Sequence, residues 1–226
     1  MTDQPHSIRS FVIRAGRITS AQQRALEELW PQFGLEYSSA LLDAAALFGR
    51  VAPRTIEIGF GNGDNLLKLA TVHPERDFLG IEVHRSGVGR VLLGLAGRQL
   101  HNVRLICHDA VEVLERQIPA GSVDEILILF PDPWPKKRHH KRRLLQRPFA
   151  TLAASRLAPG GVLRVATDWQ PYALEMLAAL SAIPELTNLA NDGGFVPRPA
   201  EREPTRFERR GERLGHEVWD LAFRRT

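Results

Sequence analysis

The segment "TIEIGFGNGDN", residues 55–65, decides the fold of this chain. A short apolar run leads into three glycines, and a helical pattern follows them. Gly59, Gly61 and Gly63 allow a tight backbone turn and a close approach to a ligand. The next apolar run ends at Glu82, 23 residues beyond Gly59, where a carboxylate can accept hydrogen bonds from both hydroxyls of a ribose. This order predicts a nucleotide site rather than a tight turn followed by an unrelated surface glutamate.

The chain beyond this segment repeats the alternation of apolar runs and helical stretches. The runs are continuous in Ile, Leu and Val, as strands buried on both faces of a parallel sheet should be. The expected strands are "TIEIG" (55–59), "DFLGIEV" (77–83), "VRLIC" (103–107), "VDEILILF" (123–130), "GVLRVAT" (161–167) and "HEVWDLAFRR" (216–225). The expected helices lie near residues 64–72, 87–99, 110–116, 145–157 and 170–182. Repeated βα units predict an α/β fold with a mostly parallel, doubly wound sheet and helices on both faces.

The first part of the chain has a helical pattern without the later apolar runs. "SAQQ", residues 20–23, is typical of a capping box ahead of a short amphipathic helix. Pro31 and Gly34 should end that helix. A second helix is expected from Ser39 to Phe48. These elements predict an accessory extension ahead of the main domain.

Length and composition favour one domain with this extension over two full domains. We assign residues 1–50 to the N-terminal helical extension and residues 51–226 to the main domain. The single cysteine, Cys107, excludes an internal disulfide and offers no metal-binding spacing. No apolar run is long enough for a membrane span and no signal peptide is recognised, so a cytoplasmic protein is expected. The sequence leaves the oligomeric state open, a homodimer included.

Acidic residues flank the glycine loop and bear on which nucleotide it takes. The spacing is G-x-G-x-G rather than G-x-G-x-x-G, with Glu57 before the loop and Asp64 after it. Their charge disfavours a pyrophosphate, which prefers a helix N-terminus free of acid. It suits a ligand with an ammonium or sulfonium group, and so favours S-adenosylmethionine over a nicotinamide dinucleotide. Asp109, after the third strand, is equally consistent with a contact to the adenine edge and with an N-cap of the next helix.

A rigid loop and a basic run, "FPDPWPKKRHHKRR" (130–143), follow the fourth strand. Prolines stiffen the loop, and Asp132 lies at the sheet edge where open α/β sheets bind ligands. Trp134 is as consistent with packing as with a contact to a base. Residues 136–143, here called the basic octet, hold three Lys and three Arg, whereas the whole chain has a net charge of +4. Such a run repels itself, which favours a nucleic-acid partner over a solvated face.

Several of these segments together resemble the bacterial tRNA (guanine-N7)-methyltransferase family. The resemblance is carried by "EIGFGNG", "GIEVHRSGVG", "FPDPWPKKRHHKRR", "TDW" and "TRFERRG", with "GRITSAQQRALEELWPQFG" upstream. It runs from about residue 10 to the end, and "PDPWPKKRH" is its most specific element. Ser86 is a departure, because the family more often has proline there. The resemblance implies a Rossmann-like class I methyltransferase with a seven-stranded sheet.

The resemblance also implies roles for individual residues. S-adenosylmethionine would be bound by Glu57, Gly59, Gly61, Gly63, Glu82, Asp109 and Asp132, and Asp132 would also touch the target base as the catalytic residue. Substrate contacts are implied for Lys136, Asp168, Thr205, Arg206, Phe207 and Glu208. RNA would be held by Arg138, His139, His140, Lys141, Arg142 and Arg143. The target would be a guanine in the variable loop of tRNA.

Methylation at N7 of guanine needs little covalent help from a protein. The nitrogen has a free lone pair in the ring plane and can attack the methyl group in line with sulfur without losing a proton, so no general base is required. Positive charge leaves sulfur and appears on the purine. Carboxylates at Asp132 and Asp168 would orient the base and stabilise that charge. Asp168 could also cap the helix that follows it, and the two roles are compatible.

Three other functions are weighed against this one. A class I methyltransferase acting on a small molecule or a protein would have no use for the basic octet. A non-catalytic RNA-binding protein with a degenerate nucleotide-binding fold would not need the intact set of glycines and acids. A nicotinamide-dependent dehydrogenase is disfavoured by the spacing of the loop and by its acids.

Overall fold

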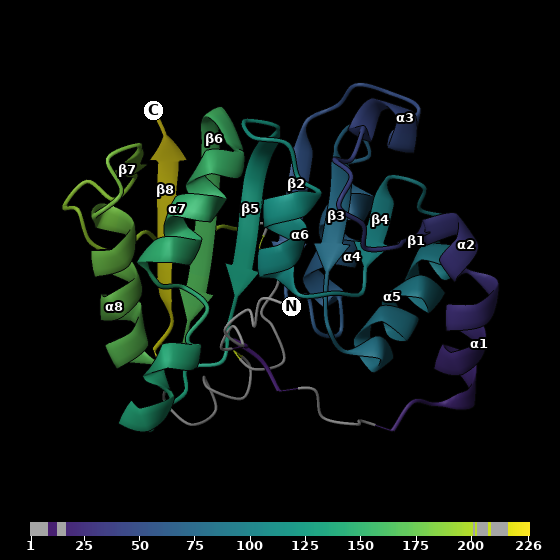
Figure 1. The fold of residues 1–226 in the computed structure, drawn as a ribbon, viewed down its shortest axis with the longest axis horizontal. Coiled ribbons are helices and arrows are strands. Elements are labelled where there is room, and N and C mark those ends of the chain that lie inside the picture. Colours follow the sequence, from purple (N-terminus) through teal and green to yellow (C-terminus); the bar gives the residue numbers. More distant parts are fainter. Residues whose placement is uncertain (1–8, 13–16, 201, 203–207, 209–216) are drawn as a thin grey trace, which may run out of the picture.

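A single eight-stranded sheet forms the centre of the computed structural model, which describes residues 9–12, 17–200, 202, 208 and 217–226. The strand order is β1-β4-β3-β2-β5-β6-β8-β7 (Figure 1). The strands are β1 (Gly34–Leu35), β2 (Arg54–Ile58), β3 (Asp77–Ile81), β4 (Val103–Ile106), β5 (Val123–Leu129), β6 (Leu157–Thr167), β7 (Leu186–Asn188) and β8 (Trp219–Arg225). All neighbours from β1 to β6 are parallel, and β8 runs antiparallel to β6 and to β7. The expected mostly parallel α/β fold is confirmed, with eight strands in place of seven.

Helices cover both faces of the sheet (Figure 1). They are α1 (Ser20–Glu28), α2 (Trp30–Phe33), α3 (Ala44–Phe48), α4 (Asp64–Val72), α5 (Arg85–Arg98), α6 (Ala110–Arg116), α7 (Arg147–Arg156) and α8 (Gln170–Ser181), with a 3₁₀ helix η1 (Lys137–Arg142). Buried residues of α6, α7 and α8 join one hydrophobic core, and those of α1, α4 and α5 join the other. The two cores lie on opposite faces, as a doubly wound sheet requires.

The central strands are buried on both faces, although β2 alternates apolar and polar residues and β3 begins with Asp77. All five residues of β3 and the last four of β2 are buried. The two strands pair in register from Arg54 opposite Asp77 to Ile58 opposite Ile81. The isoleucines of β2 join one core and β3 contributes to both cores, whereas Thr55 and Glu57 of β2 are buried polar residues. The resulting rigid centre fixes where each strand ends, and so where the loops of the site begin.

The extension differs from the expectation in its helix boundaries. The capping box lies one residue earlier, because Thr19 is the N-cap and exchanges hydrogen bonds with Gln22. Pro31 does not end the helix; it lies in the first turn of α2, where its missing N–H costs nothing. Gly34 does end α2. β1, which follows at once, pairs with β4, so the extension adds an edge strand to the sheet.

The helix expected from Ser39 is also shorter. It begins only at Ala44, because the Asp43 side chain accepts a hydrogen bond from Ala46 N–H at 3.1 Å and fixes the start there. Ahead of it, the Ser38 hydroxyl accepts from Ala40 N–H in a local turn that competes with helix. The two short strands β1 and β7 and the 3₁₀ helix of the basic octet had not been expected.

One edge of the sheet gathers the loops that follow five neighbouring parallel strands. In the order β4, β3, β2, β5 and β6 these loops carry Asp109, Glu82, the glycine loop, Asp132 and Asp168. The edge faces the bottom of Figure 1, and η1 projects from it at the lower left. Because carboxyl ends of parallel strands meet at one edge, five separate stretches of sequence converge there. Among the described helices, none is both long and apolar enough to cross a membrane.

Candidate active site

The glycine loop joins β2 to α4 with three residues in the left-handed region. The φ angles of Gly59, Gly61 and Gly63 are 69°, 56° and 76°, where residues with a side chain are strained. A Cβ atom at Gly59 or Gly61 would meet nothing within 4 Å, whereas one at Gly63 would lie 2.0 Å from Val91 Cγ2. The first two glycines therefore leave open space above the loop, and the third allows α5 to pack against it.

Glu82 connects the loop after β3 to the glycine loop. One of its carboxylate oxygens accepts a hydrogen bond from Gly61 N–H at 2.8 Å. The other accepts from Val83 N–H at 2.7 Å and from His84 N–H at 3.0 Å. The side chain is buried. Glu82 thus stabilises the glycine loop through these hydrogen bonds. A ribose bound as predicted would contact a carboxylate that already accepts from three backbone N–H groups.

Glu57 is a buried carboxyl group near the end of β2. Asn65 Nδ2 donates to its Oε2 atom at 2.9 Å. Burial raises the pKa of Glu57 from 4.5 to about 7; the Asn65 hydrogen bond opposes this, and the neighbouring charges of Glu125 and Glu82 add to it. A cation beside this carboxylate would offset the cost of ionising it. The site therefore suits a positively charged group and not a phosphate.

Asp109 caps α6, with its carboxylate accepting from Val111 N–H at 2.9 Å. Burial raises the pKa of this carboxyl group, and the hydrogen bond from Val111 opposes the rise. Of the two roles left open by the sequence, the cap is observed, and the contact with adenine stays a prediction. Asp109 also lines a hollow of about 540 Å³ together with Lys141 and Arg142. That hollow brings an acid predicted to bind the cofactor next to part of the basic octet.

The loop after β5 presents Asp132 to solvent between two strained residues. Phe130 and Trp134 have φ angles of 53° and 44°, which is rare for aromatic residues. The Asp132 side chain is exposed. Trp134 is half-buried: its Nε1 donates to Ser10 O at 3.2 Å, and the Arg142 guanidinium lies 5.0 Å from its ring centroid. Trp134 therefore packs within the loop, which was one of its two expected roles.

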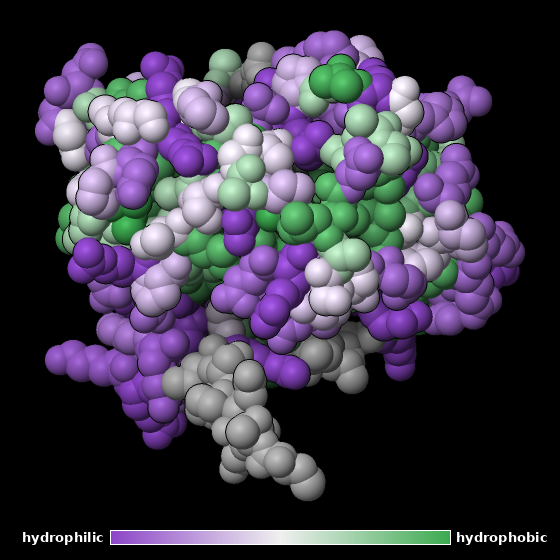
Figure 2. Space-filling model, turned by 45° about the horizontal axis from the view of Figure 1, so that its top comes forward, coloured by the Kyte–Doolittle hydropathy of each residue, from purple (hydrophilic) through white to green (hydrophobic). Residues whose placement is uncertain are grey.

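The basic octet forms η1 and points most of its cations outwards. Lys136, Lys137, Arg138 and Lys141 are exposed. Hydrophilic side chains project at the lower left of Figure 2, the position of η1 in Figure 1. Partial desolvation and then the nearby Arg138 and Arg142 charges lower the pKa of His139. The lowered pKa disfavours the charged form of His139, so this residue adds less to the positive charge of the surface than its Lys and Arg neighbours.

Arg143 is the exception within the octet, because its side chain is only 1 % exposed. Its Nε donates to Pro133 O at 2.7 Å, and its guanidinium lies 4.8 Å from the Tyr172 ring centroid. A cation in this position does not face solvent. The sequence-based expectation that Arg143 holds RNA is therefore revised: its bonding groups face the protein interior.

Asp168 follows β6 and is half-buried at the same edge. It does not cap α8, since the N-cap is Trp169 and no side chain caps that helix. Instead the turn is held by Trp169 N–H, which donates to Thr167 Oγ1 at 3.2 Å. The capping role considered for Asp168 is thus wrong. Its predicted contact with the substrate stays a prediction.

The segment predicted to contact the substrate before β8 is described only at Glu208, since Thr205, Arg206 and Phe207 lie outside the described residues. The Glu208 carboxylate is buried and accepts two hydrogen bonds from Arg202, at 2.7 and 3.0 Å. Arg202 also donates to Asp220 at 3.0 Å, and its guanidinium lies 5.6 Å from the Phe130 ring centroid. Direct contact between Glu208 and a substrate would require this cluster to open.

Four residues that support the site are not recognisable in the sequence: Arg202, Asp220, Tyr172 and Glu175. Each supports a loop of the active edge through a partner far away in the chain, such as Arg202 with Phe130 or Arg143 with Glu175. No local pattern marks such residues. A strained loop rich in proline indicates that supports must exist, but not which residues provide them.

Comparison with known proteins places the chain in a family. A family model described as "Putative methyltransferase" matches residues 51–221. The tRNA (guanine-N(7)-)-methyltransferase of Leifsonia xyli subsp. xyli is 61% identical over 216 residues, which cover 96% of this chain and 95% of that protein. The enzyme of the same name from Methylococcus capsulatus is 57% identical, with 99% and 96% covered.

Solved structures with the same fold are much more distant in sequence. The 16S rRNA (adenine(1408)-N(1))-methyltransferase of Catenulisporales acidiphilia, as a mutant with cosubstrate SAM, has a TM-score of 0.57 at 18% identity and covers 82% of this chain and 92% of its own. The 16S rRNA methyltransferase KamB has a TM-score of 0.56 at 17% identity, with 94% and 96% covered. These structures establish the Rossmann-like methyltransferase fold. The matches in sequence along almost its whole length show that the chain belongs to the tRNA (guanine-N(7)-)-methyltransferase family.

Proposed function

We propose that this protein transfers the methyl group of S-adenosylmethionine to N7 of a guanine in the variable loop of tRNA. The observation that carries the proposal is the juxtaposition at one sheet edge of the glycine loop, the exposed Asp132 and the cationic surface of η1. The relatives bearing the same enzyme name support the reaction and its tRNA substrate. Since tRNA is the substrate, we place the reaction in the cytoplasm. A homodimer stays a prediction.

The residues at the edge fit S-adenosylmethionine. Open space above Gly59 and Gly61 leaves room for a ligand against the backbone. Glu57 offers a buried carboxylate for the ammonium and sulfonium end, and Glu82 offers an acceptor for the ribose. Asp109 follows β4, one strand farther along the sheet, and is proposed to contact the adenine. When bound, the donor supplies an activated methyl group on a positively charged sulfur.

The protein's share of the chemistry is to position the guanine and stabilise the charge that the ring acquires. As the carbon–sulfur bond breaks and the bond to N7 forms, positive charge passes to the purine and no proton is released. Asp132 and Asp168 end neighbouring strands at this edge and can accept hydrogen bonds from the N–H groups of the guanine. Their negative charge stabilises the methylated, cationic base. Asp132 is thus proposed as the catalytic residue without acting as a base.

Transfer to tRNA tests the proposal directly. An unmodified tRNA transcript incubated with methyl-labelled donor should yield 7-methylguanosine at one guanine of the variable loop, identified by digestion and mass spectrometry. A transcript with 7-deazaguanine at that position should accept no label, because the attacking nitrogen is missing. Donor binding without any transfer to tRNA would favour the non-catalytic RNA-binding protein. Transfer to small acceptors but not to tRNA would favour a methyltransferase for another substrate.

Affinity for S-adenosylmethionine should depend on pH through Glu57. The pKa of this carboxyl group is raised to about 7. Below pH 7, binding of a cationic ligand to the ionised carboxylate therefore requires Glu57 to lose a proton. We expect the dissociation constant to fall as pH rises from about 5.5 to 7.5, by up to about tenfold per unit below pH 7. Calorimetric titration across that range measures it. The rate of the chemical step at saturating donor should stay flat, since N7 needs no deprotonation.

The same raised pKa affects stability without the donor. The folded-state pKa of Glu57 lies above the unfolded value of 4.5, so folding favours the protonated form. The free energy of unfolding should therefore fall as pH rises from 4.5 towards 7. Glu57→Gln keeps the shape and removes the ionisation, so both pH dependences should disappear in that variant. A Glu57→Gln protein with the wild-type pH profile of donor affinity would show that another group titrates.

A further inference from the structure

Arg143 closes the basic octet but makes its contacts inside the protein. Its Nε donates to Pro133 O at 2.7 Å, and its Nη1 lies 2.5 Å from a carboxylate oxygen of Glu175 on α8. The Tyr172 ring lies below the guanidinium, with a separation of 4.8 Å from the centroid. The Tyr172 hydroxyl accepts from Leu145 N–H at 3.0 Å. One side chain therefore connects the Asp132 loop to α8.

The Asp132 loop needs such support because its backbone is strained. Phe130 and Trp134, two residues to either side of Asp132, both have left-handed φ angles. Such conformations persist only when surrounding contacts impose them. Phe130 is held by its N–H, which donates to Ala166 O at 2.8 Å, and Trp134 is held by Ser10 and Arg142. Between them, Pro133 is held by Arg143, directly next to Asp132.

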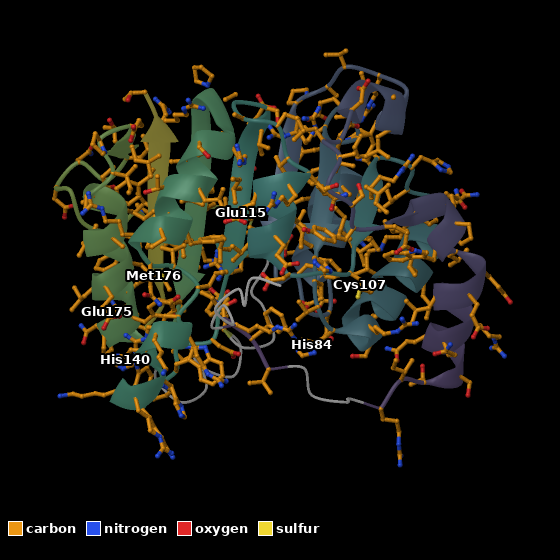
Figure 3. All side chains as sticks on the ribbon, in the orientation of Figure 1. His84, Cys107, Glu115, His140, Glu175 and Met176 are labelled. Atoms are coloured by element: carbon orange, nitrogen blue, oxygen red, sulfur yellow. The ribbon has the colours of Figure 1, made fainter. Side chains whose placement is uncertain are left out.

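Glu175 completes the connection from the other side. His140 Nδ1 lies 3.8 Å from Glu175 Oε1, so this carboxylate faces two members of the octet. Figure 3 shows Glu175 and His140 as neighbours at the lower left, and Glu115 well away from them on α6. The Glu175 side chain is 50% exposed, which weakens its ion pairs by solvent screening. Its contribution is therefore geometric: it fixes the direction in which the Arg143 guanidinium points.

The geometry points to Arg143 and Glu175 as positioning residues that hold the Asp132 loop in its reactive conformation. The inference rests on the proposed function, since it assigns these residues to the methyl-transfer step and not to RNA binding. Neither side chain needs to touch substrate or donor. Arg143 suits the task because a guanidinium can bond Pro133 O through Nε while another nitrogen faces Glu175, which a lysine ammonium cannot do in the same geometry.

Removing the connection should affect the chemical step and spare binding. We expect Arg143→Met, which keeps much of the side-chain volume, to lower the single-turnover rate at saturating tRNA and donor by roughly 10 to 10², the scale for misplacing a catalytic group. Glu175→Gln should lower the same rate to a smaller extent. Arg143→Lys should lie between wild type and Arg143→Met. The dissociation constants for tRNA and for S-adenosylmethionine should stay within about twofold of wild type, as expected when an interaction of the transition state alone is weakened.

Two readouts separate positioning from RNA contact and from general damage. If Arg143 held a phosphate, Arg143→Met would reduce the slope of log tRNA affinity against log salt by about 0.9; a positioning residue leaves it unchanged. Hydrogen exchange of the peptide covering residues 129–138 should speed up in Arg143→Met and in Glu175→Gln. Glu115→Gln, an exposed acid on α6, is the matched control and should alter neither the rate nor the exchange.

The outcomes are distinct. A reduced rate with unchanged salt slope and faster exchange in the loop supports the inference. An unchanged rate in both Arg143→Met and Glu175→Gln, or a loss confined to tRNA affinity with a smaller slope, overturns it. If Arg143→Met does not fold, Glu175→Gln alone decides, since its exposed side chain leaves the core intact. Failure of the proposed function would appear differently, as absence of methyl transfer to tRNA by the wild-type protein.

Discussion

Replacing Asp132 by asparagine is expected to lower the rate of methyl transfer to tRNA by roughly 10²–10³, the scale for removing one electrostatic stabiliser from an active site. Asparagine has the same shape and can still accept a hydrogen bond, so the change removes little besides the charge. That charge is what the purine needs as it becomes cationic. The exposed position of Asp132 just past β5 means that its substitution should leave the core and the melting temperature unchanged.

The measurement is a single-turnover rate with saturating tRNA and donor. Asp124→Asn offers a matched control, because Asp124 is exposed at the opposite end of the same strand. Its Oδ2 accepts from Arg54 N–H at 2.7 Å, and asparagine can keep that bond. The control should retain its rate. A turnover near wild type in Asp132→Asn would remove Asp132 from the centre of the mechanism, and a rate restored by raising pH would indicate proton transfer instead.

The sequence was sufficient for the parts of this fold that depend on local composition. The strands β3 and β5 are readable from their apolar runs, whereas β2, which Thr55 and Glu57 interrupt, is placed by the glycine loop that follows it. The glycine loop is readable because left-handed φ angles at three alternate positions favour glycine over residues with a side chain. The acids that follow the strands could be placed at one edge because parallel strands all end there. Helix ends were less certain, as the Thr19 cap shows.

What the sequence could not provide depends on contacts between distant residues. β1 and β7 are two and three residues long, and their pairing is decided by the neighbouring strand and not by their own composition. Six Lys and Arg side chains of the octet look alike in the sequence. Arg143 differs only because Pro133, Tyr172 and Glu175 surround it, and two of these lie about thirty residues farther along the chain.

The cluster around Arg202, on the other side of the Asp132 loop, likewise depends on contacts between distant residues. Arg202, Glu208 and Asp220 come from different parts of a charged stretch and a strand, and they are buried together. In the sequence, a loop of compensating charges is equally typical of a solvated linker. Burial converts those charges into a support for Phe130, because a buried charge persists only when it is paired. Neither the pairing nor the burial can be read from spacing alone.

Neutralising the outward-facing cations of the octet should have the second large effect, this time on tRNA affinity. The triple variant Lys137→Gln, Arg138→Gln and Lys141→Gln changes three exposed residues of η1 and leaves the buried Arg143 in place. If each contacts one phosphate, the slope of log affinity against log salt should become smaller by about 2 to 3. If wild type and variant bind equally at 1 M salt, this change of slope corresponds to a tRNA affinity about 10²-fold lower for the variant at 0.15 M salt.

Loss of net charge alone would also weaken tRNA binding, so the control must lose the same charge elsewhere. Arg24 on α1, Arg98 on α5 and Arg224 on β8 are exposed and lie outside η1. Their triple replacement by glutamine lowers the net charge of +4 by the same three units. General attraction of a polyanion would make the two triple variants equal, whereas phosphate contacts made by η1 would confine the change of slope to the first.

Kinetics then decide whether the octet contributes to binding alone. Uniform binding stabilises the bound tRNA and the transition state equally, so its loss should raise KM and leave the rate at saturating tRNA nearly unchanged. Affinity for S-adenosylmethionine should change much less than affinity for tRNA, because the three cations lie on η1 and only Lys141 borders the hollow that Asp109 also lines. tRNA titrations at several salt concentrations, with donor titrations beside them, provide both measurements. Equal slopes for wild type and the η1 variant would identify the octet as a solvated face and would leave the recognition of tRNA to other residues.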